Sequence, residues 1–413
     1  MRLLFVIQRY GREALGGSEH YCRELAEGLA ARGHVIEVLT SCAVDYQGWV
    51  NAVPAGSSVV NGVTVHRFPV EVTRDQKFYY LTERAHGAAL LGRPLPEVLE
   101  DHWMRAVGPT MIGMEDWLRG NIERFDAAAI ITYQFAHAVR ATEVIASGST
   151  VPIVLHPTAH EDVTLALEIF TDVFQKASGL VFLTAEERDL VYRRFGGTVK
   201  QKPAIVSGVG IPDAPVVGAH QRADFRSRHR IESSPFALCL GRMDENKGFV
   251  EVVDAFERYK RWKPGRLKLL LIGGGDLGGR IGQLSSEDVM FLGQVSDAER
   301  DAALAEARVF IHPSLFESFS IVVCEAWQHR TPVLVRDECA VLRGQVNRSG
   351  GGLCFRGKAE FDVMLDALAN DLSLGESLGR RGSRYVETHY RWEKILDGYE
   401  RFVGQLTESL RTV

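Results

Sequence analysis

The chain has 413 residues, of which 46% are hydrophobic and 24% charged, so it has the composition of a globular protein with room for two domains. Its net charge of −5 argues against a dedicated nucleic-acid binder, and no stretch approaches the roughly 20 apolar residues of a membrane span. The six cysteines form no C-x-x-C pair, which favours reduced thiols and a cytoplasmic protein.

The first half of the sequence alternates between strands and helices. The opening run "LLFVI" is continuously apolar, as a strand buried on both faces should be, and we interpret it as a first strand rather than a signal peptide. Further short strands are expected at 127–133, 152–156, 179–184 and 203–208. This order predicts an α/β fold with a doubly wound parallel sheet. Residues 71–122 interrupt it with an aromatic-rich helical insertion.

A polar stretch without periodicity follows and marks a domain boundary near residue 211. A second strand–helix series then begins, and the chain ends in helices with a break near 388–391. We therefore predict two Rossmann-like domains with a cleft between them, and a final helix. Their expected bounds are 1–210, 211–389 and 390–413.

Two glycine-rich turns follow predicted strands. In "ALGGSE", Gly16 and Gly17 would let backbone N–H groups at a helix start approach an anion. The turn "GGGDLG" at 273–278 fits G-x-G-x-x-G, so an NAD-dependent oxidoreductase is an alternative function. That fingerprint also needs an acidic residue about 20 residues on. The next strand ends in Gly293-Gln294, so we set this alternative aside.

Charged residues gather at two further strand ends. Arg242 and Lys247 in "GRMDENKG" suit a diphosphate whose charge grows as it leaves. In "HPSLFESFSIVVCEAW" a helix is expected to begin near Ser320, so that Ser320 and Ile321 offer free N–H groups to a phosphate. Two carboxylates flank this helix start and could accept from sugar and ribose hydroxyls. They are Glu317 and Glu325.

These motifs resemble the retaining GT-B glycosyltransferases of family 4, over nearly the whole chain. The resemblance implies that Arg242 and Lys247 hold the donor diphosphate and that Gly16 and Gly17 approach the donor. It assigns the ribose to Glu325 and the hydroxyls of the donor sugar to Glu317. The family's active-site histidine would be His156, at the end of "PIVLH", with His160 as the competing candidate.

The resemblance also sets expectations for mechanism. Relatives use no metal or other cofactor, and the absence of a D-x-D pair agrees with this. Retention is expected through front-face attack, with the leaving phosphate taking the proton of the acceptor. Two segments depart from the family pattern: "FSI" stands where "FGL" is usual, and "SGVGIP" replaces "NGVD".

The donor base and the acceptor are less clearly encoded. Asp297 could accept from guanine, which favours GDP-mannose over a UDP-sugar, although Ser296 and Glu299 also form a helix capping box there. The acceptor would be a saccharide or a lipid-linked saccharide, as in the synthesis of cell-surface polysaccharides or glycoconjugates. Two alternatives remain: a non-catalytic nucleotide-sugar-binding partner subunit, and a hydrolase or epimerase with the same fold.

The helical insertion carries the candidates for acceptor and membrane contact. Its aromatic side chains could stack on sugar faces or pack in a core, and its basic side chains could meet lipid phosphates in a peripheral membrane contact or simply face solvent. The aromatic candidates are Tyr79, Tyr80, Trp103 and Trp117. The basic candidates are Arg74, Lys77 and Arg84.

Overall fold

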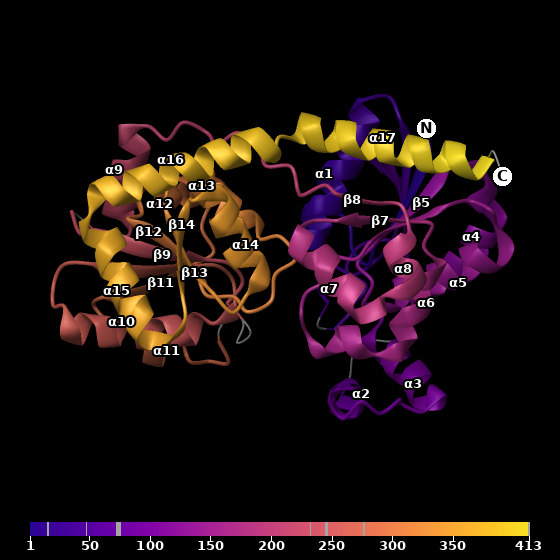
Figure 1. Cartoon of the computed structure of the whole chain (residues 1–413), viewed down its shortest axis with the longest axis horizontal. Helices are drawn as coiled ribbons and strands as arrows, with labels where there is room; N and C mark the ends of the chain where they lie inside the picture. Colours follow the sequence, from indigo (N-terminus) through magenta and orange to yellow (C-terminus); the bar gives the residue numbers. More distant parts are fainter. Residues whose placement is uncertain are drawn as a thin grey trace. The chain divides into compact units, whose positions relative to one another are not determined.

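The chain folds into two units in a computed structural model (Figure 1). The first unit comprises Met1–Val209 together with Trp392–Val413, and the second comprises Gly210–Arg391. The structure describes residues 1–14, 16–46, 48–71, 76–231, 233–243, 247–275 and 277–411.

The first unit is built on an eight-stranded sheet in the order β3-β4-β2-β1-β5-β6-β7-β8. Its neighbouring strands run parallel, except for the antiparallel pair β3 and β4 at one edge. Apolar residues on both faces of the central strands are buried between helical layers. The strands are β1 (Arg2–Val6), β2 (Val35–Ser41), β3 (Gly56–Val60), β4 (Val63–Phe68), β5 (Ala127–Ile131), β6 (Ile153–His156), β7 (Gly179–Phe182) and β8 (Ala204–Val206).

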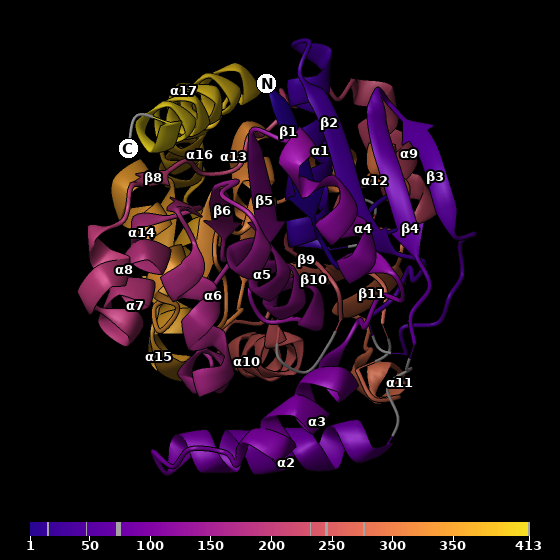
Figure 2. The same ribbon diagram turned by 90° about the vertical axis from the view of Figure 1, so that its right-hand side faces the viewer.

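Helices cover both faces of this sheet, and the insertion expected at 71–122 contains three of them. Figure 2 shows α2 and α3 lying together beyond the end of the sheet. The helices of the first unit are α1 (Gly17–Ala31), α2 (Gln76–Leu90), α3 (Glu97–Val107), α4 (Met114–Asn121), α5 (Ala136–Gly148), α6 (Thr171–Lys176), α7 (Ala185–Phe195), α8 (Gly197–Gln201) and α17 (Trp392–Arg411). Short 3₁₀ turns are η1 (Ile122–Arg124), η2 (Val163–Ala166) and η3 (Glu168–Phe170).

The second unit has a six-stranded parallel sheet in the order β11-β10-β9-β12-β13-β14. The predicted α/β class is therefore confirmed in both units. The strands are β9 (Phe236–Leu240), β10 (Lys268–Ile272), β11 (Val289–Gly293), β12 (Val309–His312), β13 (Val333–Arg336) and β14 (Gly352–Phe355). The helices are α9 (Ala219–Arg228), α10 (Phe249–Trp262), α11 (Ile281–Leu284), α12 (Asp297–Glu306), α13 (Ile321–Gln328), α14 (Ala340–Ser349), α15 (Gly357–Asn370) and α16 (Leu372–His389).

The last helix, α17, packs within the first unit although it follows the second in sequence (Figure 1). Arg32, after α1, donates to Asp397 at 2.7 Å and to Glu400 at 2.9 Å. The apolar stripe of α17 is buried, and a Cβ on Gly179 of β7 would meet the side chain of Leu406 at 2.9 Å. Glycine at that position therefore lets the helix approach the sheet. The stripe comprises Ile395, Leu396, Tyr399 and Phe402, all at most 7% exposed.

Candidate active site

The polar residues predicted in the second unit lie on loops that follow two neighbouring strands. β9 pairs with β12 in parallel, so the loops after Leu240 and after His312 leave the same edge of the sheet. Gly248 adopts φ 72° in the first loop, and a Cβ there would lie 2.9 Å from the carbonyl oxygen of Pro313. Only glycine accommodates both the left-handed backbone and this close approach.

Lys247 and Glu317 form an ion pair between these two loops. The ammonium of Lys247 lies 2.7 Å from Oε1 of Glu317 and 3.4 Å from the hydroxyl of Ser314. Nε2 of His312, the last residue of β12, lies 3.0 Å from the same carboxylate oxygen. The loops thus bring together a cation, a carboxylate and a hydroxyl, as the sequence predicted for Lys247 and Glu317, and add His312, which the sequence analysis did not single out.

The protein strongly favours the ionised form of Glu317. Burial alone would raise the pKa of this carboxyl group, but the charge of Lys247 and the hydrogen bond with His312 outweigh burial and hold the pKa well below its usual range. Glu317 is therefore an acceptor of hydrogen bonds at neutral pH, and it cannot serve as an acid.

Helix α13 begins at the expected place, directly after Ser320 and with Ile321 as its first residue. Ser320 has φ 75°, in the left-handed region, and among the described residues no side chain caps this helix start. The Ser320 hydroxyl is buried and has no hydrogen-bond partner in the described part of the chain. Gln345 fixes the loop from behind by donating to the carbonyl of Phe319 at 3.1 Å. The N–H groups of the first turn thus lack a side-chain cap among the described residues, as an anion site at a helix start requires.

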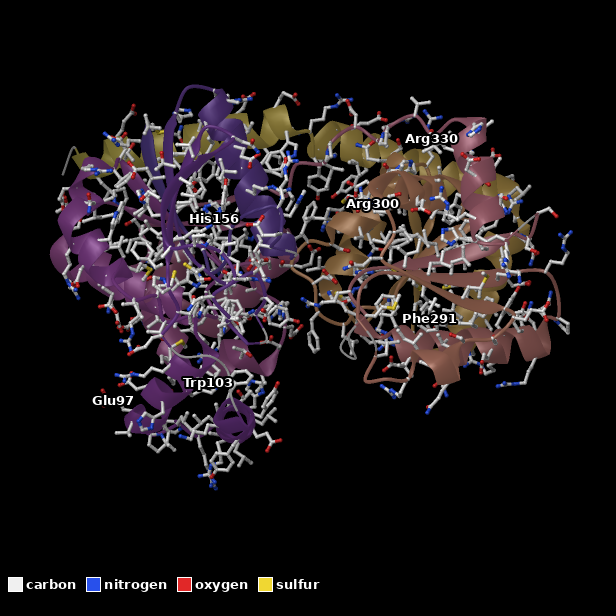
Figure 3. All side chains as sticks on the ribbon, turned by 180° about the vertical axis from the view of Figure 1, so that it is seen from behind. Glu97, Trp103, His156, Phe291, Arg300 and Arg330 are labelled. Carbon is white, nitrogen blue, oxygen red and sulfur yellow. The ribbon has the colours of Figure 1, made fainter. Side chains whose placement is uncertain are left out.

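Glu325 lies one turn into α13 and faces α12. Its Oε1 is 3.9 Å from a guanidinium nitrogen of Arg300, which also reaches Asp297 at 3.3 Å. Burial raises the pKa of Glu325, while the charge of Arg300 opposes the shift. Arg300, labelled in Figure 3, is a second residue that the sequence analysis missed. The predicted capping box is confirmed, because Ser296 and Glu299 bond each other's backbone N–H groups.

The second glycine-rich turn has a packing role. A Cβ on Gly273 would lie 1.8 Å from the carbonyl oxygen of Gly241, and one on Gly275 would lie 2.4 Å from that of Met243. Both glycines also have positive φ. The turn therefore supports the loop that carries Arg242, whose side chain is exposed, and this contact accounts for the glycines without a bound dinucleotide.

In the first unit, the turn at Gly16 and Gly17 opens α1 as expected. A Cβ on Gly16 would lie 2.1 Å from Oε2 of Glu19, whereas no described atom lies within 4 Å of a Cβ on Gly17. Glu19 is buried and accepts hydrogen bonds from Arg9 and Gln8, each at 2.9 Å. The sequence analysis missed this buried Arg9–Glu19 ion pair behind the turn.

His156 lies at the end of β6 but does not reach a surface. Figure 3 labels His156 within the first unit. Its side chain is fully buried, its Nδ1 lies 2.9 Å from the hydroxyl of Tyr21, and the centroid of its ring lies 5.4 Å from that of Tyr399 on α17. Burial lowers its pKa to about 3, so the ring is neutral. These contacts belong to a core histidine, and they do not support direct contact between His156 and a sugar.

His160, the competing candidate, is partly exposed. Its Nδ1 lies 3.0 Å from Asp162, and its side chain is 27% exposed. The loop that carries it is held by Glu187, whose buried carboxyl group accepts from the N–H of Ala159 at 2.7 Å; burial raises the pKa of this group to about 8. Thr158 in this loop has φ 50°, which is strained for a β-branched residue. Of the two histidines considered for the active site, His160 therefore has the more exposed side chain.

Two family profiles match the chain almost end to end. The profile "Glycosyl transferase 4-like domain" matches residues 16–207 and "Glycosyl transferases group 1" matches residues 221–382. The chain is a GT-B glycosyltransferase of the family 4 type. It is 22% identical to a glycogen synthase of Mycobacterium tuberculosis over 96% of this chain and 92% of that protein. It is 32% identical to a phosphatidyl-myo-inositol mannosyltransferase of the same organism, over 44% of this chain and 52% of that protein.

Solved structures support the fold of this glycosyltransferase. Sucrose-phosphate synthase from Thermosynechococcus elongatus superposes with a TM-score of 0.72 at 18% identity, covering 99% of both chains. The Anabaena protein HepE, solved in complex with UDP and glucose, superposes with a TM-score of 0.67 at 15% identity over the full length of both chains.

The glycosyltransferase exposes only part of its predicted acceptor aromatics. Tyr79 and Tyr80 on α2 are 64% and 61% exposed. Trp103 is buried and donates to the hydroxyl of Thr82 at 3.1 Å. Trp117 is half-buried against the ring of His66. Only the two tyrosines are therefore placed to meet a ligand.

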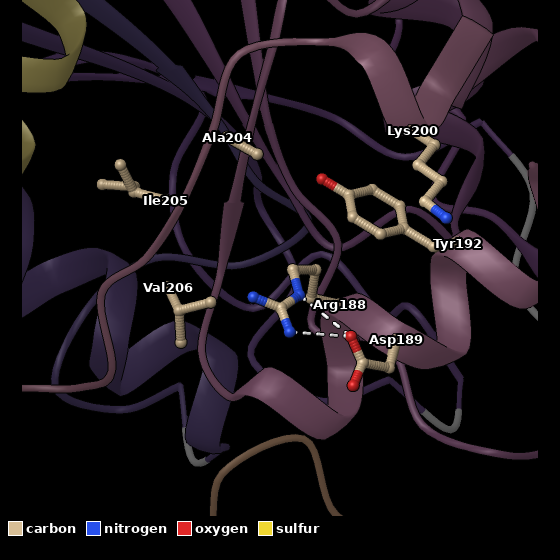
Figure 4. Close-up of a pocket in the computed structure, with 7 residues that line it drawn as sticks. All are labelled: Arg188, Asp189, Tyr192, Lys200, Ala204, Ile205 and Val206. Atoms are coloured by element: carbon tan, nitrogen blue, oxygen red, sulfur yellow. Dashed lines mark hydrogen bonds and ion pairs between the residues drawn. The ribbon is translucent and has the colours of Figure 1, made fainter. Parts of the chain in front are cut away.

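A pocket of about 370 Å³ opens beside the edge strand β8 (Figure 4). None of the predicted site residues lines it, and its guanidinium, from Arg188, is paired with Asp189 at 2.8 Å. This pocket of the first unit is therefore separate from the residues assigned to transfer. Within the described residues, we find no cluster of three metal-ligating side chains and no helix long and apolar enough to span a membrane.

Proposed function

We propose that this glycosyltransferase moves a hexosyl unit, with retention, from a nucleotide-diphosphate sugar to a saccharide or glycolipid acceptor. The observation that carries the proposal is the Lys247–Glu317 pair beside the uncapped start of α13. A fixed ammonium and the N–H groups of a helix start together stabilise a departing diphosphate.

Each residue then has a defined part. Lys247 and Arg242 bind the diphosphate, and Glu325 accepts from ribose hydroxyls because its contact with Arg300 at 3.9 Å leaves lone pairs available. The contacts of Glu317 with Lys247 and His312 both use Oε1. Its Oε2 can therefore accept from a hydroxyl of the donor sugar.

In the proposed reaction the acceptor hydroxyl attacks from the face that the diphosphate leaves. The bond between the anomeric carbon and the phosphate oxygen breaks, and a bond from that carbon to the acceptor oxygen forms on the same side. The proton of the acceptor passes to the departing phosphate oxygen. The proposed step uses no protein nucleophile, and Glu317, which Lys247 and His312 hold ionised, acts as a hydrogen-bond acceptor.

We further propose that the reaction needs no metal, because Lys247, Arg242 and the α13 helix start supply the positive charge. Transfer should persist when the enzyme is assayed in excess EDTA. If EDTA abolishes transfer and manganese or magnesium restores it, the fixed cations are insufficient and this part of the proposal is wrong.

GDP-mannose is the proposed donor, with a UDP-sugar as the alternative. Mannosyltransferase relatives and the position of Asp297 beside Arg300 support guanine, whereas HepE was solved with UDP. A thermal-shift panel of GDP, UDP, GDP-mannose and UDP-glucose tests this, since binding raises the melting temperature. Asp297→Asn should reduce the GDP shift and leave any UDP shift unchanged, while Ser296 and Glu299 keep the helix capped. A larger shift with UDP would reverse the assignment.

The acceptor is proposed to meet α2, where Tyr79 and Tyr80 are exposed. Lys77 and Arg84 are exposed on the same helix, and Arg74 lies outside the described residues. A lipid-linked acceptor would place the enzyme peripherally on the cytoplasmic face of a membrane. Sedimentation with anionic vesicles, compared between the wild-type chain and a Tyr79→Ser, Tyr80→Ser variant, tests this contact.

A further inference from the structure

A serine, a histidine and a glutamate form a hydrogen-bonded row at the edge of the first sheet. They are Ser57 on β3, His66 on β4 and Glu37 on β2, three neighbouring strands of that sheet (Figure 2). The hydroxyl of Ser57 lies 2.7 Å from Nδ1 of His66, and Nε2 of His66 lies 2.8 Å from Oε2 of Glu37. None of the three is assigned to sugar transfer.

The hairpin of β3 and β4 sets the contact between the hydroxyl and the ring. Its two-residue loop, 61–62, is flanked by Val60 and Val63, which therefore form a backbone hydrogen-bonded pair. Bonded and non-bonded pairs alternate from there, so Ser57 and His66 form a non-bonded pair, the kind whose side chains lie closest together. The register of the hairpin thus holds the Ser57 hydroxyl against the imidazole.

The carboxylate at the other end of the row is fixed and ionised. Glu37 is 7% exposed, and its Oε1 accepts from Arg124 at 2.6 Å, which leaves Oε2 for His66. Burial alone would raise the pKa of Glu37, but the hydrogen bond with His66 and the charge of Arg124 outweigh burial and lower the pKa. The ring of Trp117, with its centroid 4.7 Å from that of His66, also holds the imidazole in place.

The ionised carboxylate determines which nitrogen of a neutral His66 ring carries the proton. Glu37 has no proton to donate, so Nε2 must be the donor between them. Nδ1 then holds a lone pair, and the Ser57 hydroxyl donates to it. A serine hydroxyl bonded to an imidazole lone pair, with a carboxylate behind the imidazole, is the arrangement that activates a serine as a nucleophile.

Ser57 is also accessible to a reactant. Its side chain is exposed, and β3 is the edge strand of the described sheet. Because the pairs alternate, the N–H groups of Ser57 and Val59 point to this open edge, away from β4. They can donate to the oxygen that becomes negative when Ser57 attacks a carbonyl group. Val59 lies on the same face as Ser57 and is 72% exposed, so it offers apolar contact to a short acyl chain.

We propose that Ser57 is a second reactive centre of this chain, a nucleophile that takes the acyl group of an activated carboxylic ester. As the Ser57 oxygen bonds to the carbonyl carbon, Nδ1 of His66 accepts its proton. The ester C–O bond then breaks, and His66 passes the proton to the leaving oxygen. Water attacks the acyl-serine while His66 takes a proton from it; the carboxylic acid leaves, and His66 returns the proton to the Ser57 oxygen. Glu37 is a positioning residue that orients the ring and stabilises its charged form.

Ser58 is a matched control within the same strand. It is also exposed, but its side chain points to the opposite face, where its hydroxyl accepts from Arg67 at 2.9 Å. The full chain is treated with a fluorophosphonate, and mass spectrometry locates the label. Labelling of Ser57 should be at least about 100-fold faster than labelling of Ser58, since a general base contributes roughly 10²–10⁴-fold. Because this comparison uses the unmodified chain, it does not depend on the folding of a variant.

Variants then test the row itself, with p-nitrophenyl acetate as a second substrate. Ser57→Ala should abolish labelling and ester hydrolysis, whereas Ser58→Ala should change neither. His66→Ala should slow the labelling of Ser57 about 100-fold, and added imidazole should restore part of the rate, which a purely structural role of His66 would not explain.

The proposal fails if Ser57 and Ser58 react at similar rates, or if His66→Ala leaves the labelling of Ser57 unchanged. It also fails if imidazole does not speed labelling in a His66→Ala chain that keeps its melting temperature. Sugar transfer by Ser57→Ala should equal that of the unmodified chain, which separates this site from the proposed function.

Discussion

Both units place an ion pair near the carboxyl end of their central strands, but the two pairs differ in exposure. After β1, the side chains of Arg9 and Glu19 are 5% and 3% exposed. After β9, those of Lys247 and Glu317 are 28% and 13% exposed. The ion pair of the first unit is therefore closed to solvent, whereas the ion pair of the second unit is partly open to it.

The neighbours of each pair explain the difference. Glu19 also accepts from Gln8 and Ser18, and Arg9 donates to the carbonyl of Val44 and lies over the ring of Tyr46. Both charged groups of the Arg9–Glu19 pair are therefore bonded to other groups of the first unit. Among the described residues, the ammonium of Lys247 contacts the side chains of Ser314 and Glu317 on the loop that precedes α13, and it is more exposed to solvent than Arg9. An ion pair at a strand end identifies a binding site only when its partners leave it accessible.

The largest expected effect is on the stability of the first unit. Glu19→Gln should lower the free energy of unfolding by about 3–5 kcal/mol, because it leaves the Arg9 guanidinium buried without its counter-charge. Urea denaturation measures this. Glu115→Gln is the control: it breaks an exposed pair with Arg119 and should change stability by less than about 1 kcal/mol. Equal losses of stability in the two variants would contradict the expectation that a buried ion pair matters more for stability than an exposed one.

The open pair should matter for turnover instead. Lys247→Met should reduce sugar transfer about 100- to 1,000-fold, the range for removing one fixed donor to transition-state charge. Its melting temperature should fall by only a few degrees, because His312 still contacts Glu317. Lys358→Met, at an exposed position in α15, is the control and should leave transfer unchanged. Near-normal transfer by Lys247→Met would contradict the assigned site.

Buried histidines should make the first unit sensitive to acid. Burial lowers the pKa of His156 to about 3 and that of His137 to about 4, against about 6.5 in an unfolded chain. The unfolded state therefore binds protons that the folded state excludes. Stability from these neutral rings is present above pH 6.5 and is lost as the pH falls, by up to about 1.4 kcal/mol per pH unit for each ring.

Hydrogen exchange of the β5 and β6 amides at pH 7 and pH 5 measures this loss. His156→Gln should reduce the pH dependence by the share of one ring, since the second buried ring, that of His137, remains. His220→Gln, at an exposed position on α9, should leave it unchanged. If the pH dependence persists in full in His156→Gln, the ring of His156 is not kept neutral by burial in the folded state.

The smallest effect is expected at Ser320. Ser320→Gly should stabilise the chain by up to about 1 kcal/mol, because glycine adopts φ 75° without steric penalty and the buried hydroxyl has no partner among the described residues to lose. Ser320→Ala keeps the strained backbone and removes only the hydroxyl, so the difference between the two variants isolates the contribution of φ. Thermal denaturation compares the two. A loss of stability in Ser320→Gly would show that the hydroxyl is bonded.

The sequence predicted the α/β class because buried parallel strands read as continuous apolar runs. It missed the antiparallel hairpin of β3 and β4, although Asn61-Gly62 at its turn is a common hairpin signal; these residues have φ 48° and 84°. Motif spacing found Lys247 and Glu317, since loops after neighbouring parallel strands meet at one edge of a sheet. It could not find the Arg300–Glu325 contact, which depends on how α12 packs against α13.

The sequence also does not show which way a side chain at the end of a strand points. His156 ends β6 as expected, but successive strand residues point to opposite faces, and its side chain lies on the face covered by α1 and α17. Only the three-dimensional packing distinguishes this buried position from one that faces a ligand.

Helix α17 has a consequence for how the protein is made. The first unit needs residues 392–411, and roughly 200 residues separate them from the end of its sheet. At about 5–20 residues per second, a ribosome takes roughly 10–40 s to synthesise that interval. During this time the nascent sheet exposes the apolar surface around Tyr21 and Gly179 that α17 later covers. A stalled or truncated chain therefore leaves an incomplete first unit with exposed apolar surface. Quality control that recognises such surface can distinguish an unfinished molecule from a finished one.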